Sequence, residues 1–335
     1  MATEPLLSVR DLRVGFGPGD AVRGLSFDVY AGEVLALVGE SGAGKSLTAR
    51  AVLGMPPPGA EVRGSVRLRT PGGARELVGA RARDLRALWG RQVALVPQDA
   101  LSALSPVHPV GDQLAAAVRS VRHPSRPSRN DARARAALAL ERVGIPAARS
   151  GAYPHELSGG MRQRAVIAMA TVHEPRLVVA DEPTTALDPD LRHQVLQVLG
   201  ERRKATGAAL VLVTHDLEAV RQHADRVLVV YAGCQVESGP VARVFERPRA
   251  PYTAGLLASL SPTARGRRLP VIGGAPPAPG TLPPGCAFAP RCPLAEDRCR
   301  AERPAPRPVA DGHQVACHRH RDIPEDATDL FREPV

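Results

Sequence analysis

Residues 34–46 read VLALVGESGAGKS, five apolar residues that lead directly into a glycine-rich octapeptide. The apolar run at 34–38 has the length and composition of a buried β-strand. The octapeptide at 39–46 fits the pattern G-x-x-x-x-G-K-[ST], which forms a phosphate-binding loop when a strand precedes it and a helix follows it. The stretch therefore predicts an α/β fold that binds a nucleoside triphosphate.

Each part of this loop has an expected task. The glycines let backbone N–H groups close around phosphates at the start of a helix. We expect Lys45 to reach the β and γ phosphates and the Ser46 hydroxyl to ligate Mg²⁺. Lys45 and Lys204 are the only lysines in the chain, and a compact ammonium fits between phosphate oxygens where a planar guanidinium does not. The predicted ATP-binding residues of the loop are Gly39, Glu40, Ser41, Gly42, Ala43, Gly44, Lys45 and Ser46.

Further apolar runs surround the loop in the sequence. They lie at 93–96, 177–180, 210–213 and 227–230 and are separated by longer segments with helical character. Short continuous apolar runs of this kind are typical of strands that are buried on both faces of a parallel sheet. The segment from about 84 to 151 is rich in Ala, Arg and Leu at helical spacing and is broken by a proline-bearing stretch at 123–129. We interpret it as a mostly helical insertion, with a helical subdomain at about 84–165.

Two carboxylates, Asp181 and Glu182, end the apolar run at 177–180. An α/β sheet delivers acidic side chains to a ligand at the carboxyl ends of its strands. We expect Asp181 to hold Mg²⁺ through water and Glu182 to orient or deprotonate the water that attacks the γ-phosphate. A solvated loop start is the alternative interpretation of an Asp-Glu pair in isolation.

A second anion-binding element is predicted at Ser158, Gly159 and Gly160, which precede a probable helix. The N-terminus of a helix attracts phosphate through its backbone N–H groups. One nucleotide cannot easily use two such elements on separate faces of one chain, so we expect a dimer in which each nucleotide lies between them. The alternative is an ordinary helix N-cap formed by Ser158.

These features together resemble the ATP-binding cassette (ABC) ATPases in identity and order, over roughly residues 5–255. The resemblance rests on the phosphate loop, Gln98, 157–161, 177–182, 186–188 and His215. It implies a phosphate-loop NTPase cassette with a mainly parallel core sheet, antiparallel strands at the N-terminus and a helical insertion. It also implies a head-to-tail dimer in which Ser158 and Gly160 of one subunit contact the γ-phosphate bound by Lys45 of the other.

The same resemblance assigns roles to four more positions. Gln98 would sense Mg²⁺ and the attacking water, and His215 would contact the γ-phosphate. Asp188 would line the dimer interface. Phe16 stands where the family usually stacks a tyrosine on adenine, so this chain keeps the ring but loses the hydroxyl.

A finer resemblance, to the ATPase subunits of bacterial dipeptide and oligopeptide importers, is carried by residues 153–164 and 251–253. Relatives of these importers also carry nickel. The subfamily usually has Asp-Pro after the glutamine and Leu-Asn-Pro later, whereas this chain has Asp99-Ala100 and Leu104-Ser105-Pro106. The resemblance implies a peripheral subunit on the cytoplasmic face of the cell membrane. Its expected partners are a second ATPase subunit, identical or paralogous, two permease subunits and, indirectly, an extracytoplasmic solute-binding protein.

The chain divides by composition into a nucleotide-binding domain at 1–255 and a C-terminal extension at 256–335, which is rich in proline and glycine and predicted to be irregular. The extension holds four of the five cysteines, and Cys234 is predicted to be a small core residue. Disulfides do not persist in a reducing cytoplasm. We expect a [4Fe–4S] cluster, with a zinc ion and free thiols as the alternatives and with His313 and His318 as substitute ligands. The candidate ligands are Cys286, Cys292, Cys299 and Cys317.

The formal charge of +10 points to an acidic partner or to an arginine-rich surface. Aromatic residues make up only 3% of the chain, which disfavours single-stranded nucleic acid as the partner because such sites stack bases on aromatic rings. No run approaches the roughly 20 apolar residues that cross a bilayer, and no signal peptide is evident. The alternatives to an importer subunit are a soluble ABC ATPase acting on ribosomes or DNA and a cassette regulated by a metal- or redox-sensing tail.

Overall fold

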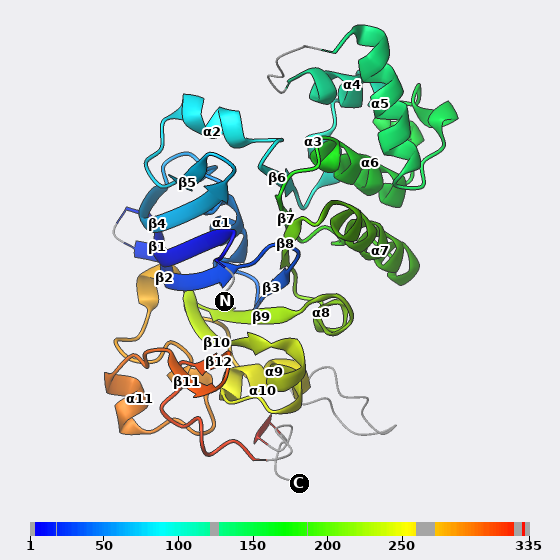
Figure 1. Ribbon diagram of the computed structural model, residues 1–335. Helices are drawn as coiled ribbons and strands as arrows, with labels where there is room; N and C mark the ends of the chain where they lie inside the picture. The colour runs from blue at the N-terminus through cyan, green and yellow to red at the C-terminus, as the bar shows by residue number, and fades with distance from the viewer. Residues whose placement is uncertain are drawn as a thin grey trace. The chain divides into compact units, whose positions relative to one another are not determined.

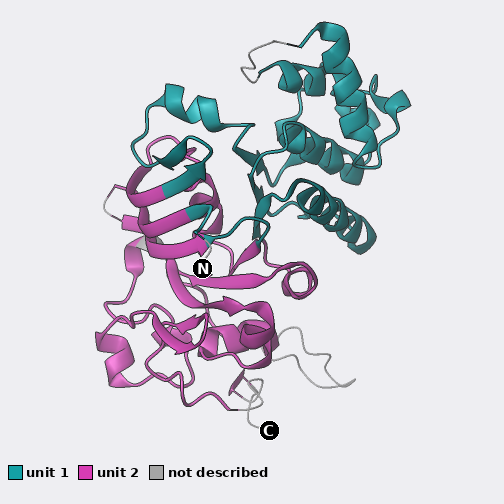
Figure 2. Cartoon of the chain, viewed as in Figure 1, with its two compact units in different colours: residues 1–7, 29–33, 67–213 teal, residues 8–28, 34–66, 214–335 magenta. Residues whose placement is uncertain are grey.

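The computed structural model describes residues 4–17, 19–120, 127–185, 187–258, 272–324 and 330–331. Ala186, which belongs to the motif at 186–188, lies outside these residues. The chain divides into two compact units that alternate along the sequence (Figure 2). Unit 1 comprises residues 1–7, 29–33 and 67–213, and unit 2 comprises residues 8–28, 34–66 and 214–335.

Unit 2 is built on a sheet that includes the strand before the phosphate loop. This strand, β3 (Val34–Val38), pairs in parallel with β9 (Arg226–Tyr231). β9 pairs antiparallel with β10 (Cys234–Pro240), which pairs antiparallel with β12 (His313–Val315). β11 (Arg307–Ala310) then pairs antiparallel with β12. All five residues of β3 are buried, as the continuous apolar run predicts for a central parallel strand.

Three helices of unit 2, at 217–223, 241–246 and 251–258, pack against this sheet (Figure 1). The core joins residues of β3 and β9 to the C-terminal extension, because Ala36, Val229 and Phe288 belong to one buried cluster. Extension and cassette therefore share one hydrophobic core in this unit. The helices of unit 2 are α1 (Lys45–Ala51), α8 (Leu217–His223), α9 (Val241–Glu246), α10 (Pro251–Ala258) and α11 (Asp297–Ala301), with short 3₁₀ turns at Pro279–Thr281 and Ala289–Arg291.

A second, smaller sheet begins the chain. In unit 2 its order is β2 (Gly19–Val29), β1 (Leu7–Phe16) and the first part of β4 (Glu61–Thr70). In unit 1 the last residues of β4 pair antiparallel with β5 (Gly73–Glu76).

Unit 1 contains three parallel strands in the order β6 (Val93–Val96), β7 (Leu177–Asp181) and β8 (Ala209–Val213). The predicted apolar runs match these strands to within one residue, and the α/β prediction is confirmed. The helices that follow β6 are α3 (Ala100–Ala103), α4 (Val110–Ser120), α5 (Arg129–Glu141) and α6 (Gly159–Thr171), with 3₁₀ turns at Ala147–Arg149 and Pro154–Glu156. Two more helices are α2 (Ala82–Leu88) and α7 (Pro189–Thr206). Across the described residues, none of the helices has the length and apolar character needed to cross a membrane.

The C-terminal extension is more regular than its composition predicts. It contributes α11, β11 and β12, and β12 extends the sheet of unit 2 beside β10. The reason is that a sheet edge offers unpaired N–H and C=O groups, so even three residues can dock there as a strand. The stretch from 272 to 285 contains only one 3₁₀ turn, in keeping with its prolines and glycines.

Candidate nucleotide site

The phosphate loop of unit 2 has the predicted strand–loop–helix context. It follows β3 and ends where α1 begins, with Gly44 as the residue before the helix. Gly39 has a φ of 152°, and a Cβ there would lie 2.1 Å from the carbonyl oxygen of Val230. A side chain at this position would therefore collide with backbone of β9, which explains why the loop needs glycine here.

Lys45 is buried at the start of α1, with 4% of its surface exposed. Its ammonium donates hydrogen bonds to the carbonyl oxygens of Gly39 at 2.9 Å and Glu40 at 3.1 Å. The lysine is thus held inside the curve of the loop by the backbone. Ser46 follows it and is half-buried.

Glu40 is tied to two distant residues of unit 2. Its backbone N–H donates to the hydroxyl of Tyr252 at 2.9 Å, and its carboxylate pairs with the guanidinium of Arg291 at 2.7 Å. Sequence reasoning did not find Tyr252 or Arg291 as site residues. The sequence carries no local signal for the arginine, because 251 positions separate it from Glu40.

In unit 1, Asp181 ends β7 and is 8% exposed. Glu182 follows it with a φ of 44°, a left-handed conformation that is uncommon outside glycine and costs about 1–3 kcal/mol. Its backbone N–H donates to the carbonyl of Val213 in β8 at 2.9 Å. Such strain is concentrated at functional sites.

The structure brings Gln98 and Glu182 together. The side-chain amide of Gln98 donates to the Glu182 carboxylate at 3.3 Å, and the hydroxyl of Thr185 donates to the same oxygen at 2.9 Å. Gln98 follows β6 and Glu182 follows β7, so two neighbouring parallel strands deliver both side chains to the same edge of the sheet. This arrangement suits the positioning of a water molecule between an amide and a carboxylate.

Ser158 is the N-cap of α6, and its hydroxyl accepts a hydrogen bond from the Met161 N–H at 3.2 Å. Gly160 is buried, and a Cβ there would lie 2.8 Å from the side chain of Leu191 in α7. Asp188 caps α7 by accepting from the Leu191 N–H at 3.0 Å. The predicted second anion element therefore stands at a regular helix N-terminus in unit 1.

Two remaining predicted residues lie in unit 2. His215 is exposed and stands just before α8. Phe16 is 43% exposed at the end of β1, so its ring can receive a planar partner from solvent. Within unit 2 the structure places Phe16, Lys45, Ser46 and His215, and within unit 1 it places Gln98, Ser158, Asp181, Glu182 and Asp188.

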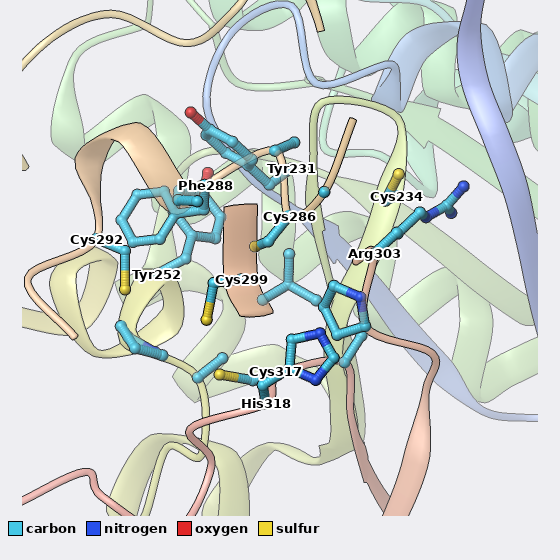
Figure 3. A pocket seen from close by; sticks show the side chains of 18 of the residues that line it. Tyr231, Cys234, Tyr252, Cys286, Phe288, Cys292, Cys299, Arg303, Cys317 and His318 are labelled. Atoms are coloured by element: carbon cyan, nitrogen blue, oxygen red, sulfur yellow. The ribbon is translucent and has the colours of Figure 1, made fainter. Parts of the chain in front are cut away.

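The four cysteines of the extension line one cavity of about 50 Å³ (Figure 3). Burial raises the pKa of the Cys292 thiol to about 11 and that of Cys317 to about 12, and it also raises the pKa of Cys286. The cavity thus favours neutral thiols over thiolates. Cys234 lines the same cavity and is only half-buried, so the prediction that it is an ordinary core residue is wrong. Cys234 is the first residue of β10, and it lines the cavity together with residues of the extension.

The predicted metal centre is not supported. Among the residues that the structure describes, no group of three or more His, Cys, Asp or Glu side chains is arranged to hold a metal ion. The four cysteines line the cavity, and the predicted substitute His313 pairs instead with Glu237 at 2.8 Å. The other substitute, His318, donates from Nε2 to the carbonyl oxygen of Glu302, 3.1 Å away. The described residues therefore give no support for a [4Fe–4S] cluster or a zinc ion.

Two family descriptions match the chain. Residues 22–185 match "ABC transporter", and residues 236–299 match "Oligopeptide/dipeptide transporter, C-terminal region". The second match spans β10 to α11 and therefore includes Arg291 and three of the four clustered cysteines.

Similar proteins of known name are peptide-transport ATP-binding proteins. The chain is 48% identical to the "Oligopeptide transport ATP-binding protein OppD" of Mycobacterium tuberculosis, over 98% of this chain and 54% of that protein. It therefore spans about half the length of this relative. It is 42% identical to the "Dipeptide transport ATP-binding protein DppD" of Bacillus subtilis, over 94% of both chains.

Solved structures of similar fold are also ATP-binding cassettes. The cbiO1 structure from Clostridium perfringens, described as part of an ABC transporter complex, has a TM-score of 0.61 at 27% identity and covers 72% of this chain and 91% of its own. A dimeric cassette, MJ0796 bound to ADP and phosphate, has a TM-score of 0.61 at 22% identity and covers 70% of this chain and 98% of its own. The latter likeness bears on the fold alone.

Proposed function

Because the chain belongs to the ABC transporter family, alongside its oligopeptide and dipeptide transport ATP-binding proteins, we propose that it hydrolyses ATP to drive the uptake of peptides. The observation that carries the hydrolytic part is the pairing of Gln98 with Glu182 at the carboxyl edge of parallel strands. The two groups are the carboxylate of Glu182 and the side-chain amide of Gln98, and the backbone at Glu182 is in a strained left-handed conformation. The peptide part is supported by the match of the extension to the transporter C-terminal region.

In the proposed site, Lys45 and the loop N–H groups bind the phosphates, and Phe16 stacks on the adenine. The Ser46 hydroxyl and the buried carboxylate of Asp181 are oxygen donors of the kind that Mg²⁺ prefers, so these residues fit the ion. Bound Mg²⁺ neutralises charge that develops on the phosphates. Glu182 accepts a proton from the attacking water while Gln98 and His215 orient the reactants.

The second half of each site comes from another cassette subunit, identical or paralogous. In the proposed head-to-tail dimer, Ser158, Gly159 and Gly160 present the N-terminus of α6 to the γ-phosphate bound by the partner. Ser158 and Asp188 are both exposed, so both are available for the proposed interface. This arrangement uses the positive end of the helix dipole to bind an anion.

Within the helical part of unit 1, α3 and the loop that follows it form the proposed contact with two permease subunits at the cytoplasmic face of the membrane. Leu101 in α3 and Val107 in the loop that follows it are 54% and 72% exposed, respectively. Apolar side chains this exposed, a few positions after Gln98, suit a surface that another protein covers. Binding there would couple permease movement to the position of Gln98. The solute-binding protein then acts only indirectly, through the permease.

The proposal is tested with the chain assembled with its partner cassette and permease in lipid vesicles. We expect slow ATP hydrolysis by the isolated chain and stimulation by the assembled complex when peptide-loaded binding protein is added. A photo-crosslinker at Val107 should capture permease, and one at the exposed Leu138 of α5 serves as the control position. Capture of ribosomal proteins or DNA instead of permease would refute the importer assignment.

The state of the extension cysteines is a separate question with a direct measurement. Free thiols are the proposed state, because burial raises the pKa of Cys286, Cys292 and Cys317 and the described residues contain no group arranged to hold a metal ion. Iron, sulfide and zinc analysis of anaerobically purified protein distinguishes free thiols from a cluster and from zinc. A stoichiometric metal that is lost in the Cys292→Ser variant would overturn this assignment.

A further inference from the structure

Arg291 connects the C-terminal extension to the phosphate loop. It is the last residue of the 3₁₀ turn at Ala289–Arg291, and 7% of its side chain is exposed. Its two terminal nitrogens donate to the two carboxylate oxygens of Glu40, at 2.7 Å and 3.0 Å. A bidentate pair of this kind fixes both position and orientation, because two parallel hydrogen bonds hold two planar groups together.

All five N–H donors of this guanidinium are used. Besides Glu40, they donate to the hydroxyl of Tyr231 at 3.1 Å and to the carbonyl oxygens of Ile272 at 3.2 Å and Gly273 at 2.8 Å. The guanidinium carbon also lies 5.8 Å from the ring centroids of Tyr231 and Phe288. Burial works against the charged form, but the hydrogen bonds to Glu40 and Tyr231 outweigh it and raise the pKa of Arg291. The arginine is therefore a permanently charged, fully bonded clamp.

Glu40 makes a hydrogen bond with its carboxylate, with its backbone N–H and with its backbone carbonyl. Its carboxylate binds Arg291, its backbone N–H donates to Tyr252, and its backbone carbonyl accepts from the ammonium of Lys45. One loop residue thus joins the extension to the lysine that is proposed to bind the phosphates. A change in the position of Glu40 must move the carbonyl on which Lys45 rests.

Three buried aromatic residues pack together next to Arg291 and Glu40. Tyr231, Tyr252 and Phe288 are at most 4% exposed, and their ring centroids lie 4.6 to 5.3 Å apart. Edge-to-face ring contacts at these separations are favourable and directional. Phe288 comes from the extension, so the extension supplies both the arginine and part of the surface on which the loop is supported.

We propose that Arg291 is a positioning residue for ATP: acting through Glu40, it sets the conformation in which the phosphate loop and Lys45 receive the nucleotide. The inference rests on the proposed function, since it concerns the same site. It assigns the C-terminal extension a direct effect on nucleotide affinity. Among the contacts of the described residues, none of the cysteines contributes a hydrogen bond to the clamp.

The test compares Arg291→Gln with Arg298→Gln in the full-length chain. Arg298 also belongs to the extension, but both side chains of its ion pair with Glu302 are exposed, and Glu302 is not part of the phosphate loop. Titration calorimetry with ATP and Mg²⁺ should give a Kd that is about 10- to 100-fold higher for Arg291→Gln, because small displacements of a binding group cost that much. The Arg298→Gln variant should bind within about twofold of the wild type, as expected for an exposed pair.

Three further measurements separate positioning from simple stabilisation. Arg291→Lys keeps the charge but not the fork, and we expect it to recover only part of the affinity. Glu40→Gln leaves the extension intact, and its Kd should rise to a similar extent even if Arg291→Gln folds poorly. Combining Glu40→Gln with Arg291→Gln should raise the Kd no further than the larger single effect, since both remove one interaction.

The outcomes are distinct for the inference and for the function on which it rests. A thermal midpoint that falls in Arg291→Gln and Glu40→Gln while the Kd stays at the wild-type value would overturn the positioning role. Additive effects in the double variant would overturn it as well. If instead the wild type itself fails to bind ATP and matches Lys45→Ala, the proposed function fails, irrespective of Arg291.

Discussion

At the scale of single residues, the chemistry of the proposed site depends most on Glu182. Its carboxylate accepts hydrogen bonds from Gln98 and Thr185, and its backbone adopts a left-handed conformation. Held in this way, the side chain has few alternative positions. Replacing it tests proton acceptance with little change of shape.

Glu182→Gln should keep ATP binding and lower the rate of hydrolysis by about 10²- to 10⁴-fold, the usual loss when a general base is removed. The amide retains the size of the carboxylate but cannot take the proton of the attacking water. Steady-state ATPase assays of the assembled complex, with nucleotide binding measured in parallel, provide the check. Glu201→Gln, on the surface of α7, is the matched control. Wild-type turnover in Glu182→Gln would show that another group is the base.

Sequence reasoning identified residues whose chemistry is local. Lys45 and Ser46 could be predicted because a loop that binds phosphate needs them at fixed spacing after its glycines. Arg291 could not be predicted, because its meaning depends on a partner 251 positions away and on the fold that brings them together. Cys234 was misjudged for the same reason, since the cavity that it lines is formed by the extension.

At the scale of elements, the parallel strands were predictable and the edge strands were not. β3, β7 and β8 are buried at every position, so their sequences are continuous apolar runs. β10 alternates buried and half-buried residues and includes glutamine, glutamate and serine, so its sequence is not a continuous apolar run. β12 has only three residues, and it forms as a strand between β10 on one side and β11 on the other.

The buried side chain of Glu237 in β10 holds this sheet edge together. It is fully buried, and its carboxylate accepts hydrogen bonds from the backbone N–H groups of Arg249 and Ala250, at 2.7 Å and 3.0 Å. The ring of His313 in β12 lies 2.8 Å from it. One side chain therefore ties β10 to β12 and to the segment that leads into α10.

Glu237→Ala should lower the free energy of unfolding by at least about 3 kcal/mol, because each buried donor left without a partner costs roughly 1–3 kcal/mol. Urea unfolding followed by circular dichroism measures the change. Glu246→Ala, at an exposed position of α9, should change the same free energy by no more than about 0.5 kcal/mol. Equal effects of the two substitutions would mean that the buried carboxylate does not hold the edge together.

At the scale of the whole molecule, the proposal requires two subunits for each nucleotide. Lys45→Ala should abolish ATP binding by the isolated chain, whereas Ser158→Arg should leave that binding within about twofold of the wild type and stop hydrolysis by the assembled transporter. The reason is that Ser158 is proposed to act on the nucleotide of the partner subunit. Binding by calorimetry and ATPase assays in vesicles measure the two effects.

Ser158 also caps α6, so its replacement carries a stability cost of about 0.5–2 kcal/mol that has to be separated from dimerisation. Ser128→Arg is the control, since Ser128 caps α5 in the same way and is exposed. Its assembled complex should hydrolyse ATP normally. Loss of ATP affinity in the isolated Ser158→Arg chain would argue that a single chain forms the whole site.

The pairing of β12 with β10 has a practical consequence for anyone who dissects this protein. A chain cut after α10, where the compositional boundary suggests a clean domain, would leave β10 as a bare sheet edge and expose Tyr252 and its neighbours, which Phe288 now covers. Unprotected edges recruit strands from other chains. Such a shortened protein should precipitate during expression, and a hybrid that exchanges cassettes between transporters should keep the native tail attached to its own cassette.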